Sequence, residues 1–372
     1  MKNLTHSLRI SIERIALTSC FVGAALLVQP CAATAFQWEY TGSLNTGRVN
    51  HTATLLPNGK VLVAGGYNRG QLASAELYDS GTGTWTVTGS LHTARYDHTA
   101  TLLSDGRVLV AGGNKTNYVY LRSAELYDPA TGTWMDTGSL NTARHGHTAT
   151  LLSDGRVLVA GGFGSSGQQL ASAELYDPAT GTWTVTGSLN VVRVEHTATL
   201  LSDGTVLVAG GSAGSYLART ELYHPASGTW TVGARLNTAR QLHTATLLAD
   251  GKVLVAGGLG SRGFLVSSEF YDPVTRNWTV TGDLNTARDL HTATLLADGR
   301  VLVAGGFIYP GGTLASAELY DPATGNWTVT GSLNTARSGH TATSLANGQV
   351  LVAGGVDGAQ VFASAELYDP GP

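Results

Sequence analysis

Most of the chain is one sequence unit repeated seven times, and this repetition limits its fold more than any other feature. A histidine followed by Thr-Ala-Thr recurs every 47 to 49 residues, and an arginine stands three residues before each histidine. The histidines are His51, His98, His147, His196, His243, His291 and His340, and the arginines are Arg48, Arg95, Arg144, Arg193, Arg240, Arg288 and Arg337. Repeats of this length form small units that bury their apolar surface against neighbouring units. The sequence therefore predicts one repeat architecture rather than several independent domains.

Each repeat is expected to form four β-strands. His-Thr-Ala-Thr-Leu-Leu is rich in strand-forming residues, and the Asp-Gly or Asn-Gly that follows is a strong hairpin signal. The next segment, Val-Leu-Val-Ala-Gly-Gly, is apolar on both faces, whereas an antiparallel strand with one solvated face would alternate. A Glu-x-Tyr strand, a turn and a strand containing Trp complete the unit. Sheets covered on both sides predict an all-β fold, a seven-bladed β-propeller of four-stranded antiparallel blades.

The number of strands predicts how the ring closes. Seven strands begin with the repeated histidine, but only six strands with Trp follow them, because the chain stops soon after Tyr368. A matching segment, Trp38-Glu39-Tyr40-Thr41-Gly42, stands at the other end of the repeats. We therefore predict a propeller domain over residues 36–372, whose ring is closed when residues 36–44 complete the last blade.

The first 35 residues are typical of a secretory signal peptide. Lys2, Arg9 and Arg14 precede an apolar stretch over residues 15–28, and Ala33-Thr34-Ala35 gives a cleavage site of small residues. Fourteen residues are too few to span a bilayer, so we expect removal of this segment and no stable membrane insertion afterwards. The protein is then secreted or periplasmic.

Composition excludes several classes of protein. Hydrophobic residues make up 42% of the chain and charged residues only 13%, which excludes disorder. The net charge of −4 becomes −6 once the signal peptide is removed, so no nucleic-acid partner is expected. Both cysteines, Cys20 and Cys31, lie in the signal peptide. The mature protein would have no disulfide and no cysteine-bound metal, and we expect no cofactor.

The repeat resembles the kelch motif in its Gly-Gly pair, in its Tyr followed seven residues later by Trp, and in its period near 48 residues. This resemblance implies a seven-bladed propeller that usually serves as a binding platform, although some members are enzymes. The Arg-x-x-His-Thr-Ala-Thr pattern is similar to that of secreted bacterial kelch proteins, some of them related to the galactose oxidase propeller. The radical cofactor of that oxidase requires a Tyr joined to a Cys at a copper site. Because the mature chain would lack cysteine, copper-radical oxidation is not expected.

The residues repeated in every copy are interpreted as structural. The seven histidines would lie too far apart around a ring to bind one metal ion, so we expect hydrogen-bonding roles for them and no metal site. The repeated Arg and Glu are expected to form seven buried ion pairs, and a bridge between adjacent blades is one arrangement open to them. The Gly-Gly pairs mark a bulge or close packing that leaves no room for a Cβ atom. The Tyr and Trp residues would pack between blades.

The variable residues lie on one predicted face, where the loops between the second and third strands join the connections between blades. Loops on a rigid scaffold are common recognition sites, and Tyr and Arg are favoured there. The candidate ligand-binding residues are Tyr67, Arg69, Tyr96, Asp97, Tyr118, Tyr120, His145, Glu195, Arg262, Asp289 and Tyr309.

Three functions are compatible with this pattern. The favoured one is a monomeric binding module that recognises a protein or a glycan through the variable face. The first alternative is a sugar-modifying enzyme, an isomerase or lyase, in which His145, Asp97, Glu195 and Asp289 supply acid–base groups at the mouth of the channel. The second alternative is a structural protein of a surface or matrix, which the near-identity of the repeats would suit.

Overall fold

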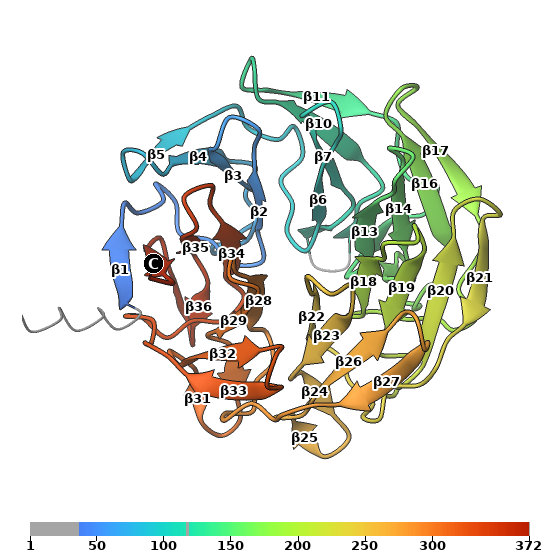
Figure 1. Ribbon diagram of the computed structural model, residues 1–372. Coiled ribbons are helices and arrows are strands. Elements are labelled where there is room, and N and C mark those ends of the chain that lie inside the picture. The colour runs from blue at the N-terminus through green and yellow to red at the C-terminus, as the bar shows by residue number, and fades with distance from the viewer. Residues whose placement is uncertain (1–36, 117–118, 372) are drawn as a thin grey trace, which may run out of the picture. The chain divides into compact units, whose positions relative to one another are not determined.

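The computed structural model describes residues 37–116 and 119–371, and all of their regular elements are β-strands. Seven four-stranded antiparallel sheets stand around a central axis, as Figure 1 shows. This arrangement confirms the predicted seven-bladed propeller. The predicted signal peptide lies outside the described residues and stays a prediction. Within the described residues, no helix is long and apolar enough to cross a membrane.

The four strands of a blade occupy the same positions in every repeat. The innermost strands are β2 (Thr52–Leu55), β6 (Thr99–Leu102), β13 (Thr148–Leu151), β18 (Thr197–Leu200), β22 (Thr244–Leu247), β28 (Thr292–Leu295) and β34 (Thr341–Ser344). The second strands are β3 (Val61–Ala64), β7 (Val108–Ala111), β14 (Val157–Ala160), β19 (Val206–Ala209), β23 (Val253–Ala256), β29 (Val301–Ala304) and β35 (Val350–Ala353). The third strands are β4 (Ala75–Asp79), β10 (Ala124–Asp128), β16 (Ala173–Asp177), β20 (Thr220–His224), β26 (Ser268–Asp272), β32 (Ala317–Asp321) and β38 (Ala365–Asp369). The outermost strands are β5 (Thr84–Val87), β11 (Thr133–Thr137), β17 (Thr182–Thr186), β21 (Thr229–Val232), β27 (Asn277–Val280), β33 (Asn326–Val329) and β1 (Gln37–Thr41).

Strand β1 closes the ring. It pairs antiparallel with β38 over its whole length, from Gln37 opposite Asp369 to Thr41 opposite Ala365. The last blade therefore contains β34, β35, β38 and β1, joining the two ends of the described chain. The predicted closure by the N-terminal strand is confirmed.

The second strands explain why the chain carries so few charges. Every residue of the seven second strands is buried, because each strand is covered on both faces by the neighbouring blades. The same packing leaves no room for a side chain at the first glycine after each of these strands. A Cβ atom on Gly161, whose φ is 66°, would lie 2.6 Å from the carbonyl oxygen of Arg193 in the next blade. Close packing against the next blade therefore explains the first glycine of each pair, whereas a Cβ atom on the second, Gly162, would lie 2.6 Å from the carbonyl oxygen of His145 in its own blade.

The repeated histidines connect neighbouring blades, as the sequence predicted. The Nε2 atom of His98 is hydrogen-bonded to the Oγ1 of Thr52 in the preceding blade at 3.0 Å, and the ring closes where His51 contacts Thr341 at 3.1 Å. Burial, followed by the charge of Arg95, lowers the pKa of His98 to about 3, so this ring is neutral.

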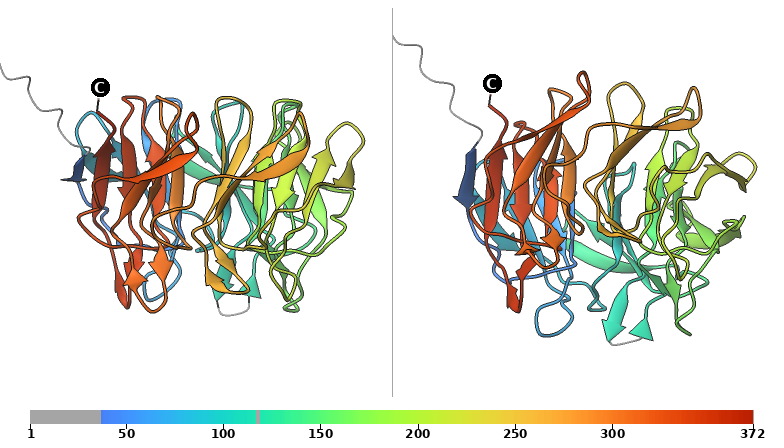
Figure 2. Two further views of the ribbon diagram at one scale, coloured as in Figure 1. Left: turned by 60° about the horizontal axis from the view of Figure 1, so that its bottom comes forward. Right: turned by 90° about the horizontal axis from the view of Figure 1, so that it is seen from below.

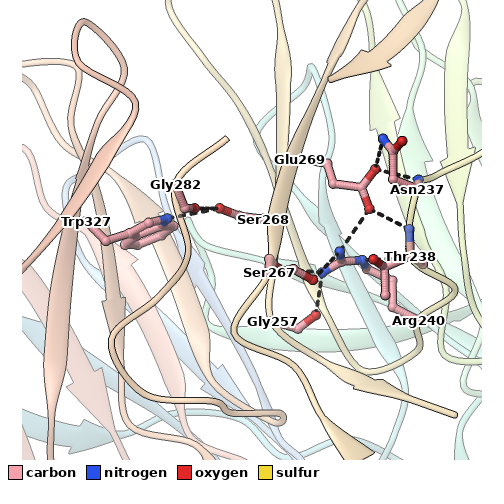
Figure 3. Close-up of polar contacts among 9 residues, drawn as sticks. All are labelled: Asn237, Thr238, Arg240, Gly257, Ser267, Ser268, Glu269, Gly282 and Trp327. Atoms are coloured by element: carbon pink, nitrogen blue, oxygen red, sulfur yellow. Dashed lines mark hydrogen bonds and ion pairs between the residues drawn. The ribbon is translucent and has the colours of Figure 1, made fainter. Parts of the chain in front are cut away.

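The repeated Arg and Glu form seven buried ion pairs, but each pair lies within one blade and does not bridge two blades. Figure 3 shows the fifth blade, where Arg240 contacts Glu269 at 2.9 Å. The arginine lies just before the innermost strand, and its guanidinium reaches the third strand of the same blade. Glu269 also accepts bonds from the backbone amides of Asn237 and Thr238, which fix the connection that enters the blade.

The two faces of the ring differ. Five short hairpins or bridged segments extend from one face, which we call the hairpin face, while the described chain ends at the other (Figure 2). Their strands are β8 (Asn114–Thr116), β9 (Val119–Tyr120), β12 (Arg144–His145), β15 (Phe163–Gly164), β24 (Leu259–Gly260), β25 (Gly263–Phe264), β30 (Phe307–Ile308), β31 (Gly312–Thr313), β36 (Val356–Asp357) and β37 (Gln360–Val361). The described variable residues, among them Tyr67, Tyr96 and Tyr120, belong to this face.

Candidate functional site

A ring of strained backbone surrounds the axis at the hairpin face. The second residue after each repeated arginine has a left-handed conformation, with φ between 50° and 60°. These residues, which we call the axial ring, are Asn50, Asp97, Gly146, Glu195, Leu242, Leu290 and Gly339. Five of the seven backbone amides donate to the carbonyl of the equivalent residue in the preceding blade, for example Asp97 to Asn50 at 3.2 Å and Glu195 to Gly146 at 3.3 Å.

The left-handed backbone of the axial ring recurs in every blade, so it belongs to the scaffold that holds the variable side chains. Five of its seven members are not glycine, and a left-handed conformation costs such a residue about 1–3 kcal/mol. Strain of this kind persists where the surrounding structure enforces it. The ring therefore fixes Asp97 and Glu195 on a rigid frame around the axis at the hairpin face, a region that we call the mouth.

Three carboxyl groups of different blades interact electrostatically at this mouth. Burial raises the pKa of Asp97 to about 6, although the Asn114 amide donates a hydrogen bond of 3.3 Å to it. Burial and then the charge of Glu195 raise the pKa of Asp289 to about 6. Burial, followed by the charge of Asp97, raises the pKa of Glu195. Glu195 is thus the electrostatic link between the two aspartates.

Asp289 is the least exposed of the three acidic residues. Its side chain is only 4% exposed, and its Oδ1 atom has no hydrogen-bond partner within the described part of the chain. A buried polar atom without a partner costs about 1–3 kcal/mol. This carboxyl is therefore held at the mouth at a cost in stability, which is common where a group serves binding or catalysis.

An arc of aromatic rings lies on the first three blades, next to Asp97. The rings of Tyr67 and Tyr96 meet edge to face at 5.5 Å, and those of Tyr120 and His145 are 4.3 Å apart. His145 also stacks on Phe163 at 5.4 Å. Burial lowers the pKa of His145, so its imidazole is neutral at pH 7. We call these five residues the aromatic arc.

The structure separates the predicted site residues into two groups. Seven of them lie at the mouth: Tyr67, Tyr96, Asp97, Tyr120, His145, Glu195 and Asp289. Arg69, Arg262 and Tyr309 are exposed at the turns of their hairpins instead. Tyr118 lies outside the described residues.

Sequence reasoning missed two elements of the site. It did not select Asn114, which is 5% exposed and holds Asp97, because one asparagine in a variable loop is not distinctive. It also missed the axial ring, although a signal was present. Four of the seven ring positions are Asn, Asp or Gly, the residues that most readily adopt the left-handed conformation.

The opposite face offers grooves of a different kind. One groove lies between two blades and is lined by Asp105, Arg107, Asp154 and Arg156. Each of these residues is a turn residue of the repeat, and each arginine pairs with the aspartate of its own turn at 2.6 Å. Since the same groove recurs between other blades, it belongs to the scaffold.

The comparisons with known proteins decide the family. A family model described as the KLHDC2/KLHL20/DRC7 Kelch-repeats domain matches residues 27–211 and 135–306, and a Kelch motif model matches residues 291–334. The chain belongs to the kelch-repeat family. No curated protein matches its sequence significantly.

Solved structures share the kelch propeller fold at low sequence identity. A fungal alcohol oxidase of the AA5 family, in complex with copper, is similar with a TM-score of 0.75 and 19% identity, over 91% of this chain and 77% of the oxidase. YjhT is similar with a TM-score of 0.62 and 16% identity, over 77% of this chain and 99% of YjhT. Identities this low show the fold and not the activity.

The mouth of the kelch propeller does not fit the copper site that the oxidase resemblance implies. Residues 37–371 contain no cysteine. Among the described residues, one group of three His, Cys, Asp or Glu side chains has donor atoms within 4.8 Å of one another, and that group lies away from the mouth. We therefore derive no copper chemistry at the mouth.

Replacing Asp289 with Asn should make the kelch propeller more stable at neutral pH. The pKa of an unfolded Asp is about 3.9. Between about pH 4 and pH 6, folded Asp289 keeps a proton that the unfolded chain has lost, so stability falls as the pH rises through this window. Asn carries no charge to desolvate, so the variant should gain about 1–3 kcal/mol at pH 7.5 and little at pH 4.

Thermal melts at the two pH values measure this difference. Asp154→Asn is the matched control, because Arg156 lowers the pKa of that exposed carboxyl and its loss should slightly destabilise the protein at pH 7.5. A gain for Asp289→Asn that is equal at pH 4 and pH 7.5 would show that burial does not penalise its charge.

Proposed function

We propose that this kelch propeller is an exported binding module that holds a glycan at the mouth of its channel on the hairpin face. The observations that carry the proposal are the aromatic arc next to Asp97 and the electrostatic coupling of Asp97, Glu195 and Asp289. Aromatic rings provide flat apolar surfaces for sugar rings, and carboxylates accept hydrogen bonds from hydroxyl groups. Export by a signal peptide at residues 1–35 is part of this proposal.

The charge of the mouth narrows the class of glycan. Its named residues include three carboxyls and no lysine or arginine, since Arg69 and Arg262 stand at hairpin turns. A sulfated or uronic-acid glycan would meet like charges there. Neutral sugars and amino sugars are therefore favoured, because a cationic amine is attracted both by carboxylates and by the faces of aromatic rings.

A glycan array followed by titration calorimetry tests the proposal. We expect binding of neutral or amino-sugar oligomers, and at least a ten-fold loss of affinity for Tyr96→Ala and for Glu195→Gln. Tyr309→Ala is the control, because this tyrosine is 76% exposed at a hairpin turn. If Tyr309→Ala lost binding and the mouth variants did not, the ligand would bind at the hairpin turns. That result would contradict the proposal and would favour a protein partner.

A second candidate function is a sugar isomerase or lyase that uses the same mouth. What favours it is that Asp97 and Asp289 both have a pKa near 6, close to the value that suits a general acid or base at neutral pH. Turnover of the bound sugar would favour this enzyme over the binding module, provided that Glu195→Gln abolishes the turnover and the control Tyr309→Ala retains it.

A further inference from the structure

The second blade departs from the repeat at two positions that touch each other. His92 stands where the other six blades have Asn, and Asp136 stands where they have Val or Tyr. Asp136 is on the outermost strand β11, opposite Glu125 of β10, while His92 is in the connection that enters the blade. The two positions are 44 residues apart in sequence, yet the His92 Nδ1 and Asp136 Oδ1 atoms are 3.0 Å apart.

These departures create a set of three metal-binding side chains. The imidazole of His92 and the carboxylates of Glu125 and Asp136 offer donor atoms that lie within 4.8 Å of one another. His92 and Asp136 are exposed, whereas Glu125 is fully buried. The set therefore opens to solvent on one side and rests on the rigid blade on the other.

The buried glutamate of this set accepts one hydrogen bond fewer than its equivalents in the other blades, which favours a ligand at the set. In the other six blades, the Oε2 atom of the buried glutamate accepts one bond from a backbone amide and a second from the Asn side chain, at 2.8–3.0 Å. Glu125 Oε2 accepts only the backbone amide of His92, at 2.7 Å. The imidazole has replaced the amide donor, so this buried oxygen keeps a lone pair that no described group uses.

The charge around the set also favours a cation. Arg95 and Glu125 neutralise each other at 2.7 Å, as their equivalents do in every blade. Asp136 adds a negative charge that the uncharged residues at this position in the other blades do not. The second blade thus has a carboxylate directly opposite its buried glutamate, where the other blades have an uncharged side chain.

We propose that His92, Glu125 and Asp136 bind one divalent transition-metal ion of the Zn²⁺ class. One imidazole nitrogen and two carboxylate oxygens are ligands that zinc accepts, and water would complete the coordination. The ion would link the connection at His92 to Glu125 on β10 and to Asp136 on β11. This site is separate from the mouth, and its test does not depend on the proposed function.

Titration calorimetry of the purified protein with Zn²⁺ tests the site. We expect one ion per chain, with affinity lowered at least 100-fold in His92→Asn and in Asp136→Val. Both substitutions restore the residue found in other blades, so both variants should fold, and Asn should return the missing hydrogen bond to Glu125. Uptake that is equal in the wild type and in the double variant would overturn the proposal and leave an exposed His–Asp ion pair only.

Introducing the same His and Asp into the third blade tests whether these residues are sufficient to create a second site. Asn141 and Val185 occupy the equivalent positions around Glu174. The double variant Asn141→His, Val185→Asp should bind a second Zn²⁺, so that the stoichiometry rises from one to two. With Co²⁺ as a spectroscopic probe, its visible absorption per chain should double. A stoichiometry that stays at one would overturn the assignment of these three residues as ligands.

Discussion

A chain that begins at Asn45, and so lacks residues 36–44, should melt at least about 10 °C below the complete propeller. The loss removes strand β1, which pairs with β38 over five residues and completes the last blade. Without it, β38 becomes an open edge strand, and the ring loses the contact between the two ends of the described chain.

The side chain of Trp38 accounts for much of this expected loss. It is 7% exposed, and its ring lies 5.1 Å from that of Tyr368. Its Nε1 donates a hydrogen bond of 2.8 Å to the carbonyl of Gly331 on the neighbouring blade. Losing a buried Trp costs about 3–5 kcal/mol, and the lost strand pairing adds to it. Each kcal/mol lost from the free energy of unfolding lowers the melting temperature of a large domain by roughly 2–4 °C.

Calorimetric melts of the complete and shortened chains measure the effect. Tyr40→Ala is the control on the same strand, since Tyr40 is 61% exposed and its loss should change the melting temperature little. A synthetic peptide of residues 36–44 should restore part of the lost stability by pairing with β38. If the shortened chain melted like the complete one, the ring would not depend on its N-terminal strand.

The fold could be predicted from the sequence because every local signal recurs seven times and agrees with the others. The apolar second strands, the Asp-Gly turns and the missing last Trp strand all specify the same blade. The buried Arg–Glu pairs were also predictable, but their position within a blade was not. It depends on how far the Arg240 guanidinium reaches beneath the second strand, which no sequence spacing reveals.

The site could be predicted only in part, because burial at the mouth depends on neighbouring blades. Asp289 and Arg262 are both charged residues outside the repeated pattern, yet one is buried and the other is exposed at a turn. The sequence places both on the hairpin face and gives no means of separating them. His92 and Asp136 look like isolated changes in the sequence. They come together because Asp136 lies opposite Glu125 in the pairing of β10 and β11, and the backbone amide of His92 donates to Glu125.

Replacing Glu174 with Gln should lower the free energy of unfolding by about 3–5 kcal/mol, although the two side chains have nearly the same shape. Arg144 is fully buried and contacts Glu174 at 2.7 Å. Burial lowers the pKa of Arg144, and the charge of Glu174 opposes that shift. Gln leaves the buried guanidinium without a counter-charge, and removing one partner of a buried ion pair costs far more than removing an exposed pair.

Urea unfolding of Glu174→Gln beside Asp154→Asn separates the two kinds of ion pair. Asp154 pairs with Arg156 at 2.6 Å in an exposed turn, so its loss should cost at most about 1 kcal/mol. A large loss for the first variant and a small one for the second would establish that the repeated charges serve the scaffold. The buried carboxyls at the mouth would then differ from the Arg–Glu pairs, because they do not stabilise the fold. An equal, small loss for both would remove that distinction, and with it the reason for preferring the mouth over the repeated Arg–Glu pairs as the functional site.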